Sequence, residues 1–215
     1  SAASDVYKRQ AHTLGVPVPA TRCFADVADI RESHIAPLEF PCYLKAAISV
    51  SGVGIYRCQN EAELRNAITR FAPGTPVQVQ AEVVTDLFLN LQYQVNGQGL
   101  VRLAATEQIL EGPVHQGNRY PAAHAPWDCV EPMAERLSKE GMRGIFAFDV
   151  AVMDRPHGPD YLVIECNPRF NGASYPTAIA GKLGIGQWLG RSFKTDCRSL
   201  AYVDLSGLEY DTSSG

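Results

Sequence analysis

The chain has 215 residues with a formal net charge of -4 at pH 7, and 46% of its residues are hydrophobic, enough to bury the core of one large domain or two lobes. The acidic balance offers no basic field for nucleic acid. No apolar run reaches the length of a membrane span, and nothing resembles a signal peptide.

The six cysteines are widely scattered and show neither a C-x-x-C pair nor a metal-type spacing. Such cysteines are typical of reduced thiols in an intracellular protein. We therefore expect a cytoplasmic protein that binds neither nucleic acid nor membranes. The sequence does not indicate its oligomeric state.

Both ends of the chain look foreign to a complete protein. The run Asp5–Gln10 resembles the translation of a transposase adaptor used in preparing sequencing libraries, so residues 1–10 are expected to be non-native. At the other end, residues 204–215 stop within what reads as a continuing strand and turn. We expect the chain to be truncated at both ends.

Three helices and two hairpins are predicted along the chain. Asn60 and Glu63 have the spacing of a capping box ahead of a helical apolar stripe. In residues 89–95 apolar and polar side chains alternate, which predicts a strand with one wet face, and Asn96-Gly97 is a hairpin signal. A second stripe, Val130–Leu137, predicts a helix that Gly141 ends. A third helix is expected to start at Ser174, where Tyr175-Pro176 follows.

Two apolar stretches, residues 145–153 and 161–167, read as strands, and turn-forming residues separate them. If they pair as a hairpin centred on that turn, Met153 faces Tyr161. The same register places two acidic residues of the two strands opposite each other.

These acids are Asp149 and Glu165. Directly opposed side chains lie about 5 Å apart, where like charges repel, and a divalent cation removes the conflict. Asn167 lies two residues beyond Glu165, on the same face, and adds a neutral oxygen. Oxygen ligands of this kind suit Mg²⁺. The alternative is a solvent-facing hairpin with scattered acids, which the flanking Phe146 and Phe148 argue against.

Lys45 ends an apolar run, where an unpaired buried ammonium would be costly and a phosphate would satisfy it. The glycines of Ser49–Gly54, just downstream, allow backbone N–H groups to approach phosphate oxygens closely. A plain hairpin turn is the alternative, and Lys45 favours the phosphate loop. The candidate contacts in the loop are Ser51, Gly52 and Gly54.

Taken together, these motifs resemble the ATP-grasp superfamily. The acidic strand is followed by an E-x-N-x-R motif, made of Glu165, Asn167 and Arg169. Upstream, Pro41–Lys45 looks like the P-x-x-x-K strand that precedes the glycine loop, and Gly15–Pro19 looks like a G-V-P-x-P motif. Two further segments, 106–112 and 115–121, are similar to the carboxylate–amine ligase branch, which is peptide-ligase-like.

The resemblance implies an α+β, ATP-grasp fold with the nucleotide between two lobes. We expect a small lobe over residues 11–81, a large lobe over residues 82–215, and a missing N-terminal pre-ATP-grasp domain. The crossover between the lobes would present backbone groups of Ala81 and Val83 to adenine. Gln80 stands where the family usually has Glu, and Asp86 is a candidate for the ribose hydroxyls. For Gln80 and Asp86, an ordinary buried strand with polar ends is the alternative.

The same resemblance implies an ATP-dependent ligase that forms an amide or peptide bond through an acyl phosphate and releases ADP and phosphate. Asp149, Glu165 and Asn167 would hold one or two Mg²⁺ ions, with Mn²⁺ as an alternative. Lys45 and Arg169 would act in catalysis by neutralising phosphate charge. The substrates would be a small-molecule carboxylate and an amine, amino acids among them.

Four residues are candidates for positioning the acceptor or the γ-phosphate. They are Glu107, Gln108, His115 and Arg119. For His115, a histidine in a surface loop is the alternative. Two other classes of function stay open: a biotin-carboxylase-like or carboxylate–thiol ligase, and a noncatalytic ATP-binding regulatory module. The intact Asp/Glu/Asn/Arg set argues against the module.

Overall fold

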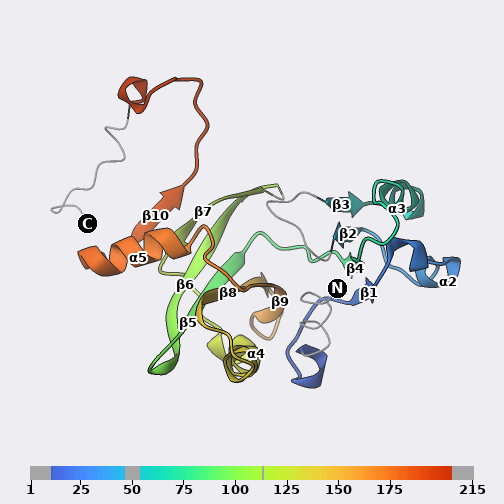
Figure 1. The fold of residues 1–215 in the computed structure, drawn as a ribbon, viewed down its shortest axis with the longest axis horizontal. Coiled ribbons are helices and arrows are strands. Elements are labelled where there is room, and N and C mark those ends of the chain that lie inside the picture. The colour runs from blue at the N-terminus through green and yellow to red at the C-terminus, as the bar shows by residue number, and fades with distance from the viewer. Residues whose placement is uncertain (1–10, 47–53, 113, 205–215) are drawn as a thin grey trace.

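The computed structural model describes residues 11–46, 54–112 and 114–204. Within these ranges the chain forms two antiparallel sheets with helices packed on them, which confirms the predicted α+β class. One sheet has four strands in the order β1-β4-β2-β3, and the other has six in the order β10-β7-β6-β5-β8-β9. Figure 1 shows the two sheets side by side, each with its own helices.

The smaller sheet comprises β1 (Thr21–Phe24), β2 (Cys42–Ala46), β3 (Ile55–Cys58) and β4 (Val77–Ala81), with helices α2 (Glu32–Ile35) and α3 (Glu61–Ile68). The larger sheet comprises β5 (Phe88–Asn96), β6 (Gly99–Glu111), β7 (Val114–Tyr120), β8 (Gly144–Met153), β9 (Asp160–Asn167) and β10 (Trp188–Arg191), with α4 (Trp127–Lys139) and α5 (Ser174–Leu183). Two short 3-10 helices cover Val27–Asp29 and Leu200–Tyr202.

The smaller sheet buries one face and leaves the other polar. Leu44, Val77 and Val79 pack with the apolar side of α3 in one core cluster. The predicted cap of α3 is confirmed, because the Asn60 Oδ1 accepts a hydrogen bond from the Glu63 N–H at 3.0 Å. Since side chains alternate along a strand, the neighbours of Leu44 on β2 point to the opposite face. That face is turned away from α3.

The larger sheet packs its apolar face on α4. Tyr93, Phe146 and Phe148 are fully buried there, with Val130 and Met133 of the helix against them. The predicted hairpin is confirmed at the end of β5, where Asn96 pairs with Gly99. The predicted second and third helices correspond to α4 and α5.

The second face of the larger sheet differs from the sequence prediction. Asn90 and Gln92 alternate with the core residues of β5 as expected, but they are only 4% and 0% exposed. The prediction of a wet face was therefore wrong at these two positions. The amide of Gln92 donates to the Thr177 hydroxyl of α5 at 3.0 Å, so this helix covers part of the polar face.

The β8–β9 hairpin has the predicted partners at its functional end and different partners at its turn. Asp149 pairs with Glu165, as expected, whereas Met153 pairs with Asp160 and not with Tyr161. A register irregularity between Asp149 and Val150 accounts for the one-residue difference. Such bulges insert one extra residue into a strand and are frequent next to functional sites.

The described residues that precede β1 pack with the larger sheet, although they fall within the expected small lobe. Ala11 and Val16 belong to the core cluster of the larger sheet, with Val18 packed against it. The Val163 N–H of β9 donates to the Pro17 carbonyl at 2.8 Å. The chain therefore passes between the two sheets twice, just before β1 and just after β4.

Two expectations from composition can be compared with this structure. No helix of the described ranges is both long enough and apolar enough to cross a membrane. All six cysteines are free thiols, as the scattered spacing predicted.

Candidate functional site

The polar face of the larger sheet brings four side chains into one row across four strands. Thr106 of β6 pairs with Asn90 of β5, which pairs with Asp149 of β8, which pairs with Glu165 of β9. Residues that are paired in register point to the same side of a sheet. The two carboxylates thus stand next to each other on one surface, and Asn167 follows Glu165 on that same surface.

Asp149 lies at the centre of a cluster of amide donors. Its Oδ1 accepts hydrogen bonds from the side chains of Asn90 and Gln108, both at 2.7 Å, and its Oδ2 accepts one from Asn167 at 2.9 Å. Each of these amides comes from a different strand. The arrangement fixes the carboxyl group while leaving Glu165 exposed beside it.

The electrostatic cost of this arrangement appears in the ionisation of Asp149. Burial and, to a smaller extent, the neighbouring charge of Glu165 raise the pKa of Asp149 to about 7, although hydrogen bonds from Asn90 and Asn167 and the charge of Arg169 act in the opposite direction. Two adjacent carboxylates with no cation between them destabilise the ionised state. A bound divalent cation would reverse the effect.

The oxygens at this position fit a small, hard cation. Among the described residues, no group of three or more His, Cys, Asp or Glu side chains is placed to hold a metal, so the candidate ligands are two carboxylates and neutral amides. The Oδ1 of Asn90 is buried next to Asp149 without a hydrogen-bond partner. Mg²⁺ binds through one or two carboxylates and keeps water or phosphate oxygens as its other ligands, which matches this set.

Lys45 approaches the site from the smaller sheet. Its Nζ donates to the Gln80 Oε1 at 2.6 Å, and the Gln80 Nε2 donates to the Thr21 hydroxyl at 3.3 Å. Burial lowers the pKa of Lys45, and the charge of Glu165 on the larger sheet acts in the opposite direction. Because Gln80 is neutral, it satisfies Lys45 without cancelling its positive charge.

Arg169 lies just beyond β9 and is exposed. Its Nη1 donates to the Phe170 carbonyl at 3.2 Å. Its charge lowers the pKa of Asp149, which places the guanidinium within electrostatic reach of the carboxylate pair. The structure thus brings Asp149, Glu165 and Asn167 together, and the pKa values show the influence of two further expected residues, Lys45 and Arg169.

The expected phosphate loop is described only at its end. Ser51 and Gly52 lie outside the described residues. Gly54 adopts a positive φ of 77°, a conformation that L side chains rarely adopt, and its carbonyl accepts a hydrogen bond from the Ala46 N–H at 2.9 Å. This bond extends the β2–β3 ladder and fixes where the loop returns to the sheet.

The expected adenine-binding residues lie where the chain leaves the smaller sheet. Gln80 is 3% exposed, and the Ala81 N–H donates to the Ala20 carbonyl at 2.8 Å. Val83 is half-buried, and Asp86 is exposed in the segment between β4 and β5. Glu82 lies in the same short segment and was not predicted as a site residue from the sequence.

The four acceptor candidates divide between the two faces of the larger sheet. Gln108 contacts Asp149 on the polar face. His115 is exposed and lies against Gly172, where an added Cβ would come within 2.8 Å of the imidazole. Glu107 pairs in register with the core residue Leu89, hence on the opposite face, and forms an ion pair there with Arg119. The structure therefore does not bring Glu107 and Arg119 to the carboxylate pair.

A hydrogen-bond network connects His115 to the site. The His115 Nε2 and the Asn118 Oδ1 are 2.7 Å apart, and the Asn118 Nδ2 donates to the Thr106 hydroxyl at 3.0 Å. Thr106 neighbours Asn90 in the central row. Asn90 and Asn118 were not predicted as site residues from the sequence. The alternation along β5 was the available signal for Asn90, but it was interpreted as a solvent-exposed face, whereas Asn90 binds Asp149 of the neighbouring strand.

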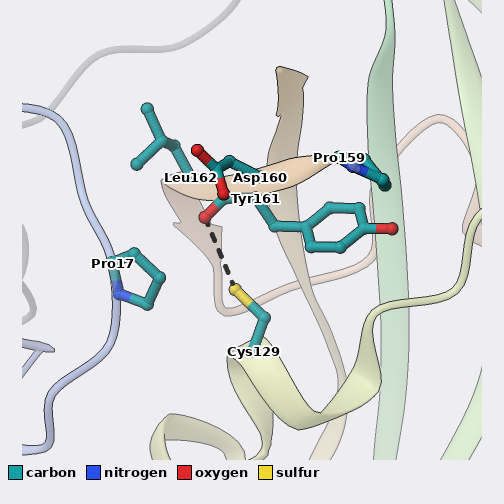
Figure 2. A pocket seen from close by; sticks show the side chains of 6 residues that line it. All are labelled: Pro17, Cys129, Pro159, Asp160, Tyr161 and Leu162. Carbon is teal, nitrogen blue, oxygen red and sulfur yellow. Dashed lines mark hydrogen bonds between the residues drawn. The ribbon is translucent and has the colours of Figure 1, made fainter. Parts of the chain in front are cut away.

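A pocket of about 310 Å³ lies elsewhere, between the N-terminal segment, α4 and the start of β9. Figure 2 shows Cys129 pointing toward the Tyr161 carbonyl, 3.9 Å from its Sγ. The residues that line the pocket are Pro17, Cys129, Pro159, Asp160, Tyr161 and Leu162. None of them is an expected site residue, so this pocket is separate from the carboxylate pair.

Solved structures share this fold. Carboxyaminoimidazole ribonucleotide synthase from Aspergillus clavatus, complexed with ATP, has a TM-score of 0.63 at 13% identity, over 79% of this chain and 45% of that one. Biotin carboxylase from Campylobacter jejuni has a TM-score of 0.64 at 18% identity, over 82% and 43%. L-Amino acid ligase from Bacillus licheniformis has a TM-score of 0.58 at 15% identity, over 82% and 41%.

The chain spans less than half the length of each of these three proteins. No protein-family profile matches the sequence. At these identities the likeness concerns the fold and leaves the reaction open. The two antiparallel sheets of this chain superpose on the fold that these proteins share, and the chain has the ATP-grasp fold.

Proposed function

We propose that this chain forms the nucleotide-binding part of an ATP- and Mg²⁺-dependent ligase that joins a carboxylate to an amine. The observation that carries the proposal is the in-register pair of Asp149 and Glu165, with Asn167 bound to Asp149 on the same face. The charge of Glu165 also raises the pKa of Lys45 on the other sheet. Two acids of one sheet and one half-buried ammonium of the other are suited to hold a metal together with a phosphate chain.

The nucleotides bound in similar solved structures support ATP as the proposed ligand. One was solved with ATP, and another, N5-carboxyaminoimidazole synthase from Aspergillus clavatus, was solved with ADP and 5-aminoimidazole ribonucleotide. The similar L-amino acid ligase supports amino acids as a substrate class. For this chain, ATP, the carboxylate and the amine belong to the proposal.

Each residue has a role that its position allows. Asp149, Glu165 and Asn167 would hold one or two Mg²⁺ ions, which supply charge neutralisation for the terminal phosphates. Lys45 and Arg169 would bind phosphate oxygens that the metal leaves uncovered. Phosphoryl transfer depends on positioning and charge more than on a nucleophilic side chain. The proposed reaction therefore assigns no residue as a nucleophile.

In the proposed reaction, a substrate carboxylate attacks the γ-phosphate of ATP and gives an acyl phosphate and ADP. The amine then displaces phosphate and forms the amide. Gln108 and His115, both tied to the polar face, are the residues we propose for positioning the acceptor. Ser51, Gly52 and Gly54 would cover the phosphates, with Gln80, Ala81, Val83 and Asp86 around the nucleoside.

The test uses the complete protein with ATP, Mg²⁺, hydroxylamine and a panel of amino acids. Hydroxylamine traps an acyl phosphate as a hydroxamate, so we expect ADP and a hydroxamate to form together. Release of AMP would contradict the acyl-phosphate mechanism. A requirement for bicarbonate or for coenzyme A would favour the biotin-carboxylase-like or the carboxylate–thiol reaction, and nucleotide binding without any turnover would favour a regulatory module.

A further inference from the structure

Glu82 is the first residue after β4, at the point where the chain leaves the smaller sheet. Its side chain is only 12% exposed, and both of its oxygens are engaged. The Arg57 guanidinium donates to Oε1 at 2.5 Å and to Oε2 at 2.8 Å, and the Tyr43 hydroxyl donates to Oε1 at 3.2 Å. A bidentate arginine–carboxylate contact of this kind restricts both the position and the orientation of the carboxylate.

The partners of Glu82 belong to the face of the smaller sheet that carries Lys45. Gln80, Tyr43 and Arg57 are consecutive neighbours in one row across β4, β2 and β3. The Lys45 Nζ lies 5.5 Å from the centre of the Tyr43 ring and also binds Gln80. Lys45, which we propose to bind phosphate, and the two residues that bind Glu82 therefore lie on one continuous polar surface.

Charge keeps this contact intact at neutral pH. The hydrogen bond from Arg57 is the largest influence on Glu82 and holds the pKa of Glu82 below its usual value. The same contact raises the pKa of Arg57, and burial raises the pKa of Tyr43. Glu82 is thus ionised, while Arg57 is charged and Tyr43 is neutral.

The far side of the crossover is attached to the larger sheet. The Thr85 hydroxyl donates to the Val152 carbonyl at 2.5 Å and accepts from the Leu87 N–H at 3.2 Å. The Val152 N–H in turn donates to the Leu87 carbonyl at 3.0 Å. Val83 and Val84 thus lie between two attachment points, Glu82 on the smaller sheet and Thr85 on the larger sheet. Glu82 is the one next to the proposed adenine contacts.

We infer that Glu82, held by Arg57 and Tyr43, is a positioning residue for base recognition: it fixes the backbone of Ala81 and Val83 where the proposed function places adenine. This inference rests on that proposed function. A backbone contact cannot be corrected by a change of rotamer, so its accuracy depends on neighbouring side chains that hold the chain in place. Glu82 itself needs no contact with the nucleotide.

Replacement of Glu82 is expected to affect the binding of the base and of the phosphates differently. Loss of the Glu82 anchor should weaken a ligand that carries adenine and spare one that carries only phosphates, because Lys45 and the carboxylate pair are unchanged. A general loosening of the smaller sheet would weaken both ligands. The comparison therefore separates positioning from a merely structural role.

The experiment measures binding of Mg²⁺–ATP and of Mg²⁺–tripolyphosphate by calorimetry in the complete protein. Glu82→Gln keeps the shape and removes the charge, and we expect the Kd for ATP to rise about tenfold while that for tripolyphosphate changes less than about twofold. Glu61→Gln is the matched control, because Glu61 forms an exposed ion pair with Arg65 and should leave both constants unchanged.

Two further variants guard against misfolding. Tyr43→Phe removes only the 3.2 Å hydroxyl contact and should weaken ATP by about two- to threefold. The double variant Arg57→Glu with Glu82→Arg should recover part of the ATP affinity that either change alone removes. Equal weakening of ATP and tripolyphosphate in Glu82→Gln, or no weakening of either, would overturn the inference. If the unaltered protein bound neither ligand, the proposed function would fail, and the inference with it.

Discussion

The surroundings of Asp149 act in opposite directions on the ionisation of its carboxyl group. Three amide donors stabilise its ionised form, while burial and the adjacent Glu165 stabilise its protonated form. Burial is the largest influence, and the pKa rises from 3.8 to about 7. The same residue that would bind a metal therefore makes the metal-free fold less stable, which is common at functional sites.

This conflict predicts a pH-dependent effect of Asp149→Asn. An unfolded chain ionises Asp149 near 3.8 and the folded protein near 7, so ionisation destabilises the metal-free fold progressively between these two values. Each pH unit in that window corresponds to about 1.4 kcal/mol at most. Thermal unfolding in EDTA should show the stability of Asp149→Asn, relative to the unaltered protein, growing from pH 4 to pH 7 and then staying constant.

The same variant should lose its response to Mg²⁺–ATP. The ligand should raise the Tm of the unaltered protein at pH 8 and leave that of Asp149→Asn nearly unchanged, because a ligand stabilises a fold only through the state that it binds. A stability difference that does not vary with pH would contradict the assignment of a raised pKa to Asp149.

Glu165 tests the metal site without the same structural complication. It is exposed and stands directly opposite Asp149, so Glu165→Gln should leave the fold intact. The loss of one carboxylate ligand should reduce ADP release at least about a hundredfold. Glu111→Gln, on an exposed residue of β6, is a suitable control. Unchanged turnover in Glu165→Gln would count against the metal assignment.

At the scale of elements, the contact between β7 and β10 depends on one glycine. A Cβ added to Gly117 would lie 2.0 Å from the Gly190 carbonyl oxygen, a backbone atom that cannot rotate away. A Cβ added to Gly190 would meet only the Pro176 and Trp188 side chains, at 3.5 Å or more. The two glycines sit on neighbouring strands, yet only one of them is sterically required.

We predict that Gly117→Ala separates β10 from β7 and that Gly190→Ala does not. The indole of Trp188 stacks on Tyr120, with ring centres 6.0 Å apart, and reports on this contact. In a background where Trp127 is replaced by Phe, Gly117→Ala should shift the Trp188 emission to longer wavelength and lower the amide protection of β10. Identical spectra for the two alanine variants would contradict the predicted clash.

The β8–β9 hairpin shows how much of the site could be predicted from the sequence. Strand periodicity and turn residues were sufficient to place Asp149 opposite Glu165, and the structure has this pairing. The Met153–Tyr161 pairing was wrong, because a bulge shifts the register by one residue between the turn and the site. A bulge leaves no clear mark in composition, so a prediction centred on the turn could not detect it.

Other parts of the site depend on contacts between distant segments. Asn90 and Gln108 were either missed or given no partner, because their contact with Asp149 requires the order of strands within the sheet. Glu82 was missed because its partner Arg57 lies 25 residues away on another strand. Local patterns predicted helix caps and hairpins, while side-chain pairs formed across the sheets needed coordinates.

At the scale of the whole molecule, each sheet buries an apolar face on its own helices and keeps a polar face with functional groups. Lys45 stands on the polar face of the smaller sheet, and Asp149 and Glu165 stand on that of the larger one. Figure 1 shows the sheets joined by the crossover that follows β4. The charge of Glu165 raises the pKa of Lys45, which agrees with the nucleotide site that we propose between these two faces.

The most direct test of this account is the position of a metal ion in crystals grown with Mn²⁺ and a non-hydrolysable ATP analogue, located by anomalous diffraction. We predict a peak that bridges the carboxylates of Asp149 and Glu165 at metal–oxygen distances of about 2.1 Å, with the phosphates completing the coordination toward Lys45. A metal held by the phosphates alone, with Asp149 still bound only by the amides of Asn90, Gln108 and Asn167, would contradict the proposed site.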